Sequence, residues 1–150
     1  MKYTILCLNG PNLNMLGTRK KNYYGQKTLA EINDQLSVLS KQLNCKAIFF
    51  QSNIEGEIID FIQEQRDKAH GILINAGPLT FNGYALRDAL EDALLPVVSV
   101  HLSNLYTRKE EFRHKDIVAE IAVGGIYGFK DDSYLLGLQA LITHISSSEK

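Results

Sequence analysis

Cysteine is scarce in this chain, and neither sign of charge is in clear excess. Only two of the 150 residues are cysteines, Cys7 and Cys45, and they lie far apart. They predict free thiols in a reducing compartment and argue against a disulfide framework. The 16 basic and 17 acidic residues leave a net charge of -1. No global basic field recruits nucleic acid, so we expect no nucleic-acid partner.

Long hydrophobic runs are also missing. No stretch approaches the ~20 apolar residues of a membrane-spanning helix. The short apolar run near the N-terminus ends at Asn9-Gly10-Pro11 and lacks the small-residue cleavage site of a secretory signal. The sequence therefore predicts no membrane partner and a cytoplasmic protein.

Several motifs that would identify a chemistry are absent. The chain has no G-x-G-x-x-G after the first apolar run, no G-x-x-x-x-G-K-[ST], no H-E-x-x-H and no G-x-S-x-G. These absences argue against a dinucleotide site, a P-loop, a zinc protease and a serine hydrolase. The four histidines are scattered, and the lysines lie at polar positions, loops or chain ends. We therefore expect no metal site and no Schiff-base lysine.

What is present is an alternation of strand and helix patterns in a length that suits one domain, 1–150. Strands are predicted at about 3–8, 46–50, 71–75, 96–101 and 120–127. Helices are predicted from Thr28 to Leu43, over 55–70, over 83–94, and from Asp132 or Ser133 through Ile145. The alternation predicts an α/β fold, a flavodoxin-like doubly wound five-stranded parallel sheet with helices on both faces. It leaves the strand order open.

Polar residues directly follow three of the predicted strands. Asn9-Gly10-Pro11-Asn12 follows the first strand, Asn75-Ala76-Gly77 the third, and His101-Leu102-Ser103 the fourth. In open α/β sheets, ligands bind just outside the carboxyl ends of the strands. These three strand ends therefore point to one site.

A long polar loop between the first strand and its helix carries Arg19, Tyr23 and Tyr24. It is either a solvated connector or a lid that brings Arg19 and a tyrosine over the strand ends. A second arginine, Arg108, follows the His101 segment. Two guanidinium groups beside one phenol favour the phenolate, which is a competent general base.

The strand-end residues allow more than one interpretation. His101 is either a core histidine satisfied by a backbone carbonyl or a proton donor. Asn75 is either a turn residue or a group that holds a ligand hydroxyl or orients the histidine. Asn12 is a candidate for holding a water or donating to an oxyanion near the end of the first strand.

Taken together, these segments resemble type II 3-dehydroquinate dehydratase, nearly from end to end. No single segment is specific, but the combination is. The segments are Leu8-Asn9-Gly10-Pro11-Asn12-Leu13-Asn14, Gly17-Thr18-Arg19, Tyr24-Gly25, Gln51-Ser52-Asn53-Ile54-Glu55-Gly56-Glu57, Asn75-Ala76-Gly77, Leu86-Arg87-Asp88-Ala89, Val100-His101-Leu102-Ser103-Asn104, Phe112-Arg113-His114 and the stretch from Gly128 to Leu136.

The resemblance implies a single catalytic domain, 1–150, that converts 3-dehydroquinate to 3-dehydroshikimate in the shikimate pathway of aromatic amino-acid biosynthesis. It implies elimination of water without metal, cofactor or covalent imine, so 3-dehydroquinate is the one small-molecule partner expected. The family assembles as a homododecamer, a tetramer of trimers, and Asp88 would buttress the site across a subunit contact.

The resemblance also implies the catalytic roles. Tyr24 takes the proton next to the ketone, and Arg19 and Arg108 keep it ionised. Tyr24 is preferred to Tyr23 because the family's tyrosine immediately precedes a glycine, five positions after the arginine. His101 protonates the departing hydroxyl.

The remaining implied roles concern the enolate and the substrate. Asn12 and the loop backbone hold a water that stabilises the enolate, and Asn75 helps to hold the departing hydroxyl. Leu102 and Ser103 offer backbone and hydroxyl donors to the substrate carboxylate, and Arg113 binds the ring hydroxyls.

The chain departs from the family pattern at three places. Phe81 stands where the family has a substrate-binding histidine, which removes a hydrogen bond worth roughly 0.5–3 kcal/mol. Ser99 stands where the family has a glutamate that orients His101 and raises its basicity; serine orients weakly and cannot raise basicity. The segment Arg108 to Phe112 is one residue longer than usual, which leaves the placement of Arg108 and Arg113 open.

The departures keep two alternatives open. One is a catalytically weakened or repurposed paralogue. The other is a flavodoxin-like module that binds a small ligand such as a flavin, a function the fold permits. Pro11 argues against the second, because it removes a backbone donor from the loop that would hold a phosphate.

Overall fold

Five apolar segments pair into one parallel sheet, which confirms the predicted fold class. The computed structural model describes residues 1–149. The strand order is β2-β1-β3-β4-β5, and every neighbouring pair is parallel. This is the order of flavodoxin-like doubly wound sheets. The strands are β1 (Tyr3–Asn9), β2 (Cys45–Gln51), β3 (Gly71–Asn75), β4 (Val97–His101) and β5 (Gly124–Tyr127).

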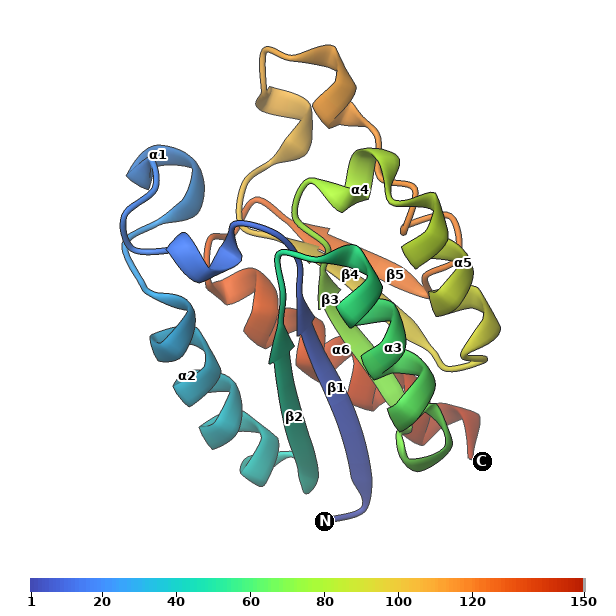
Figure 1. The fold of residues 1–150 in the computed structure, drawn as a ribbon. Helices are drawn as coiled ribbons and strands as arrows, with labels where there is room; N and C mark the ends of the chain where they lie inside the picture. The colour runs from blue at the N-terminus through green and yellow to red at the C-terminus, as the bar shows by residue number, and fades with distance from the viewer. Residues whose placement is uncertain (150) are drawn as a thin grey trace.

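Helices cover both faces of the sheet (Figure 1). On one face α2 and α6 pack with β1, β3 and β4 in a single apolar cluster, and on the other face α3 and α5 form a second cluster. The helices are α1 (Lys21–Tyr24), α2 (Leu29–Gln42), α3 (Glu55–Gln65), α4 (Leu79–Asn82), α5 (Tyr84–Asp92) and α6 (Asp132–Ser148).

The central strands are buried because both of their faces meet helices. All five residues of β3 and of β4 are buried, as are six of the seven in β1. This burial explains why these strands read as continuous apolar runs. Cys7 packs inside β1, and burial raises the pKa of its thiol. It is therefore a core residue, as the sequence predicted.

Helix α2 forms where the sequence placed it. The Thr28 hydroxyl accepts a hydrogen bond from the backbone of Glu31, whose side chain accepts one from the backbone of Thr28. This reciprocal capping box satisfies two free N–H groups at the start of the helix. Ile32 and Leu36 then face the core.

The loops after β1 and β3 lie in direct contact at the carboxyl edge of the sheet. The backbone N–H of Gly10 donates to the Asn75 carbonyl at 2.8 Å. A Cβ on Gly10 would lie 2.2 Å from the Ala76 carbonyl oxygen. Only glycine allows this approach. The backbones that follow β1 and β3 are therefore in direct contact, and two of the predicted strand ends lie together.

Several predicted boundaries were wrong. The fifth strand begins at Gly124 and not at 120, because residues 117–121 form a turn that Asp116 caps through the N–H groups of Val118 and Ala119. Helix α3 ends at Gln65 and not at 70. A 3₁₀ turn follows it, and the chain then joins the sheet. The N-cap of α6 is residue 131, one position before the predicted cap.

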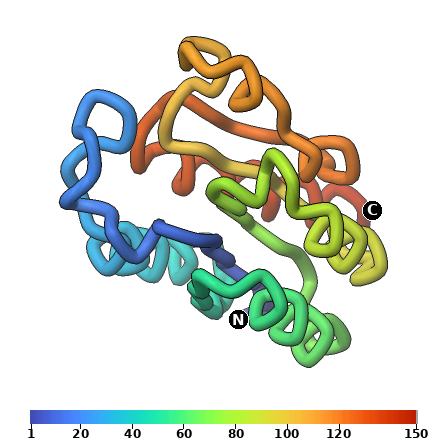
Figure 2. Tube along the Cα trace, turned by 45° about the horizontal axis from the view of Figure 1, so that its top comes forward, coloured from blue at the N-terminus to red at the C-terminus, as the bar shows by residue number. Residues whose placement is uncertain are grey.

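Three segments rise above the carboxyl edge of the sheet (Figure 1), and Figure 2 shows them with this end of the molecule turned forward. They are the blue segment 10–28 that contains α1, the yellow-green segment around α4, and the gold to orange segment 102–117. None of the helices in residues 1–149 combines the length and apolar character needed to cross a membrane.

Candidate active site

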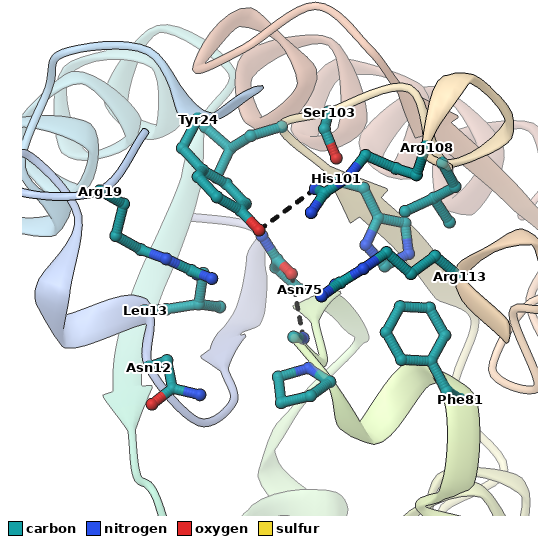
Figure 3. A pocket seen from close by; sticks show the side chains of 14 residues that line it. Asn12, Leu13, Arg19, Tyr24, Asn75, Phe81, His101, Ser103, Arg108 and Arg113 are labelled. Carbon is teal, nitrogen blue, oxygen red and sulfur yellow. Dashed lines mark hydrogen bonds between the residues drawn. The ribbon is translucent and has the colours of Figure 1, made fainter. Parts of the chain in front are cut away.

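A pocket of about 150 Å³ opens between these three segments. Every predicted site residue except Asp88 lines it (Figure 3). The side chains come from the loop after β1, the α1 segment, the ends of β3 and β4, helix α4 and the segment after β4. The strand ends therefore meet at one site, as their positions in the sequence indicated.

The α1 segment brings Arg19 and Tyr24 to the pocket. The Tyr24 hydroxyl accepts a hydrogen bond from Nη1 of Arg108 at 3.2 Å. The guanidinium carbon of Arg19 lies 3.8 Å from the centroid of the Tyr24 ring, and that of Arg108 lies 3.9 Å from the Tyr23 ring. Both guanidinium groups thus touch aromatic rings of this segment, an arrangement that favours the lid over the solvated connector.

The charge of the pocket is positive. Arg19, Arg108 and Arg113 line it, and none of its lining residues within the described part of the chain is acidic. Arg108 is only 8% exposed, and within residues 1–149 neither Arg19 nor Arg108 lies within ion-pair distance of a carboxylate. Arg113 pairs with Glu110 at 3.4 Å. A buried guanidinium without a carboxylate is unfavourable, so the charge of this pocket favours the binding of an anion.

His101 has a carboxylate partner that the sequence did not reveal. Its Nε2 lies 2.9 Å from Oδ2 of Asp116, and the Ser99 hydroxyl donates to the same oxygen at 2.9 Å. Burial alone would raise the pKa of the Asp116 carboxyl. The hydrogen bond and charge of His101, with donors from Ala119 and Ser99, outweigh burial and lower this pKa. The carboxylate that Ser99 cannot supply thus reaches His101 from Asp116.

Asn75 is held by a buried network. Its Oδ1 accepts from the Gly77 N–H at 3.1 Å, and its Nδ2 donates to the Tyr134 hydroxyl at 2.9 Å. Tyr134 in turn donates to Oδ1 of Asn9 at 2.6 Å, and burial raises the pKa of this phenol. Asn75 is thus a turn residue on the pocket wall. No hydrogen bond joins it to His101 in the part of the chain described.

Tyr134 was missed as a supporting residue, and a signal for it existed. It is a phenol among the apolar positions of α6, and buried tyrosine hydroxyls usually find a partner. Asp116 offered almost no signal, because its contact with His101 forms through a turn that the sequence pattern did not predict.

Phe81 and Arg113 form one wall of the pocket. The rings of Phe81 and Phe112 meet edge to face with centroids 5.3 Å apart. The Arg113 guanidinium carbon lies 4.9 Å from the Phe112 ring centroid and 5.9 Å from that of Phe81. A hydrogen bond of 2.8 Å between His114 Nε2 and the Arg108 carbonyl joins the two ends of the segment 108–114. The sequence left the placement of Arg108 and Arg113 open, and the structure shows that both line the pocket.

Asn12 and Ser103 present polar groups to the pocket. Asn12 adopts a left-handed conformation with φ of 69°, fixed by a hydrogen bond from its N–H to Oδ1 of Asn53 at 2.9 Å. No described residue forms a hydrogen bond with the side-chain amide of Asn12 or with the Ser103 hydroxyl. Leu102, only 2% exposed, lines the pocket beside Ser103.

Asp88 lies apart from this pocket. It is on α5 with a side chain that is 71% exposed, 3.2 Å from Nη1 of Arg87. Its predicted role across a subunit contact stays a prediction. No group of three or more His, Cys, Asp or Glu side chains in residues 1–149 is arranged to hold a metal ion.

Comparison with known proteins agrees with this geometry. The family model described as dehydroquinase class II matches residues 3–142. A 3-dehydroquinate dehydratase from Acaryochloris marina is 51% identical over 144 residues, which cover 96% of each chain. A 3-dehydroquinate dehydratase from Nostoc sp. is 51% identical over 142 residues, covering 95% of this chain and 96% of the relative.

Solved structures agree as well. The type II dehydroquinase from Butyrivibrio crossotus superposes with a TM-score of 0.89 at 39% identity, covering 93% of this chain and 97% of that one. The type II dehydroquinase from Propionibacterium acnes gives a TM-score of 0.90 at 33% identity, covering 95% and 98%.

Proposed function

This chain belongs to the class II dehydroquinase family, and from that premise we propose that it is a 3-dehydroquinate dehydratase. The reaction is the elimination of water from 3-dehydroquinate to give 3-dehydroshikimate. The observation that carries the proposal is the hydrogen bond from buried Arg108 to the Tyr24 hydroxyl, in a pocket that His101 also lines.

In the proposed mechanism Tyr24 acts as the base. Its phenolate removes the proton from the carbon next to the ketone, and an enolate forms. Arg108 donates to the phenolate oxygen, and Arg19 lies against the ring, so two cations stabilise the anionic form. The Asn12 amide and the loop backbone hold a water that donates to the enolate oxygen.

His101 acts as the acid in the second step. The enolate electrons reform the ketone and expel the hydroxyl, which takes the imidazolium proton and leaves as water. The water therefore leaves with the proton of His101, and the cycle closes when the Tyr24 phenol returns its proton, by way of solvent, to the neutral imidazole. Asn75, on the adjoining strand end, helps to hold the departing hydroxyl.

Substrate binding is proposed to use other residues that line the pocket. The backbone at Leu102 and the hydroxyl of Ser103 donate to the substrate carboxylate, while Arg113 binds ring hydroxyls. The positive charge of the pocket supports an anionic substrate. Phe81 contributes an apolar contact in place of a hydrogen bond.

The wider biology is proposed from the family. The chain acts without metal or cofactor in the shikimate pathway, in the cytoplasm. It assembles as a homododecamer in which Asp88 supports the site of a neighbouring subunit, which agrees with its exposure on α5. Analytical ultracentrifugation tests the assembly: a monomer with full activity would contradict it.

The activity is tested with 3-dehydroquinate by following the ultraviolet absorbance of the conjugated enone product. We expect turnover that is unaffected by a chelator. Tyr24→Phe should lower the rate about 10²–10⁴-fold, the usual range for a general base. Borohydride added with substrate should not inactivate the protein, because no imine forms. Absence of product, or inactivation by borohydride, would contradict the proposal.

Neither alternative drawn from the sequence is favoured. The relatives carry the dehydratase name over nearly their full length. A weakened paralogue was suggested by Ser99, but Asp116 supplies a carboxylate to His101. A flavin-binding module predicts a shift in melting temperature on adding FMN, which we do not expect.

A further inference from the structure

We propose that Asp116 is the positioning residue for His101. It fixes which ring nitrogen faces the pocket, and it stabilises the imidazolium that delivers the proton. The inference rests on the proposed dehydratase function, in which His101 protonates the departing hydroxyl.

The geometry assigns different tasks to the two ring nitrogens. Nε2 of His101 lies 2.9 Å from Oδ2 of Asp116, and the Ser99 hydroxyl, 3.4 Å from Nε2, donates to the same carboxylate oxygen. Nδ1 has no hydrogen bond to any residue of the described chain, and His101 lines the pocket. In the imidazolium both nitrogens carry protons. Asp116 therefore accepts from Nε2, and Nδ1 delivers its proton to the substrate.

Asp116 is held rigidly enough to orient a ring. Its Oδ1 accepts from the N–H groups of Val118 and Ala119, each at 3.0 Å. Ile117 and Val118 are fully buried, and the Ile117 N–H donates to the Thr80 carbonyl at 3.0 Å. The carboxylate is thus anchored in a turn against α4. A partner fixed in this way is what sets the tautomer and orientation of functional histidines.

The surrounding charges make Asp116 the source of the negative field at His101. Its lowered pKa keeps it ionised at neutral pH. The other charged or titratable side chains of the pocket are Arg19, Tyr24, Arg108 and Arg113. The arginines remain cationic at all working pH values and disfavour an imidazolium. Asp116 offsets them.

The first test replaces the carboxylate by an amide. Asp116→Asn keeps an oxygen for the two turn N–H groups and removes the charge. We expect kcat to fall about 10–100-fold, the usual cost of removing the hydrogen-bond partner that orients a functional histidine. KM should change little, because Asp116 does not line the pocket. The alkaline limb of the kcat–pH profile should move to lower pH, because the imidazolium loses its negative neighbour. Asp60→Asn, on the exposed face of α3, should leave both unchanged.

The second test moves the carboxylate from residue 116 to residue 99, the other residue near Nε2 of His101. Residues 99 and 101 point to the same face of β4, and the Ser99 hydroxyl already lies near Nε2. The double variant Ser99→Glu with Asp116→Ser places an acid on the strand and a short capping hydroxyl in the turn. We expect kcat to return to within about threefold of the wild type and the alkaline limb to return with it.

The outcomes separate this inference from the proposed function. An inactive wild type would contradict the function, and nitrogen-15 NMR of the His101 ring would still test the positioning. We expect the Nε2–H tautomer in the wild type and its loss in Asp116→Asn. An unchanged tautomer, or an active Asp116→Asn with the wild-type pH profile, would overturn the inference. If Asp116→Asn does not fold, recovery in the double variant supports the inference, and an inactive but folded double variant contradicts it.

Discussion

Phe81 lines the pocket but is not one of the proposed proton-transfer groups. It packs edge to face on Phe112 beneath the Arg113 guanidinium. A phenyl ring offers surface and no donor, so in the proposed function residue 81 gives the substrate ring no hydrogen bond. The loss should appear in substrate binding and not in the rate of the chemical step.

Restoring a donor at this position should therefore tighten binding. For Phe81→His we expect KM for 3-dehydroquinate to fall roughly 2–10-fold, the value of one net hydrogen bond of about 0.5–1.5 kcal/mol, with kcat nearly unchanged. Steady-state kinetics measure both constants. An unchanged or raised KM would show that Phe81 occupies no position in contact with the substrate ring.

Individual residues differ in how far the sequence reveals them. Arg19 and Tyr24 could be predicted because one short segment carries both with a fixed spacing. The contact of Asp116 with His101 crosses 15 positions, and that of Tyr134 with Asn75 crosses 59. Such contacts depend on how a turn or a distant helix packs. The phenol among the apolar positions of α6 indicates that Tyr134 needs a hydrogen-bond partner, but no local pattern identifies the partner of either residue.

At the scale of elements, the turns after β1 and β3 decide where the site forms. Gly10 and Gly77 lie where each loop meets the other's backbone: a Cβ would lie 2.2 Å from the Ala76 oxygen in one case and 2.8 Å from the Pro11 oxygen in the other. Backbone atoms held by a sheet cannot move aside cheaply. The two loops therefore fix the spacing between the first and third strand ends.

A methyl group at Gly10 should disrupt this junction. We expect Gly10→Ala to lower the free energy of unfolding by about 3 kcal/mol or more, measured by urea denaturation at matched protein concentration. Gly56→Ala is the control, because Gly56 lies in α3 with nothing within 4 Å of its Cβ position. It should raise the free energy of unfolding by about 0.5–1 kcal/mol. Equal stability of the two variants would contradict the close approach.

Whether an element boundary could be predicted depended on whether its signal lies in the local sequence or in tertiary contacts. Helix α2 has its start encoded locally by Thr28 and Glu31, so its position was predicted correctly. The start of β5 was not, because residues 117–121 are apolar enough to resemble a strand, yet a capping carboxylate and packing against α4 hold them in a turn. Tertiary contacts override local pattern at such places.

At the scale of the whole molecule, the proposed base and acid belong to different parts of the fold. Tyr24 comes from the α1 segment, whereas His101 ends β4 at the sheet edge (Figure 3). The pocket lies between them. In the proposed mechanism, proton removal and proton delivery thus use separate groups on separate elements, so a substitution at one of them should affect one step and spare the other.

The proposal that Tyr24 is the base is tested most directly by following the substrate hydrogen next to the ketone by NMR in deuterium oxide. With His101→Ala, which lacks the acid, we expect that hydrogen to exchange for deuterium while dehydration nearly stops. Adding Tyr24→Phe to the same variant should abolish the exchange. Exchange at an undiminished rate in the double variant would contradict the assignment of Tyr24 as the base.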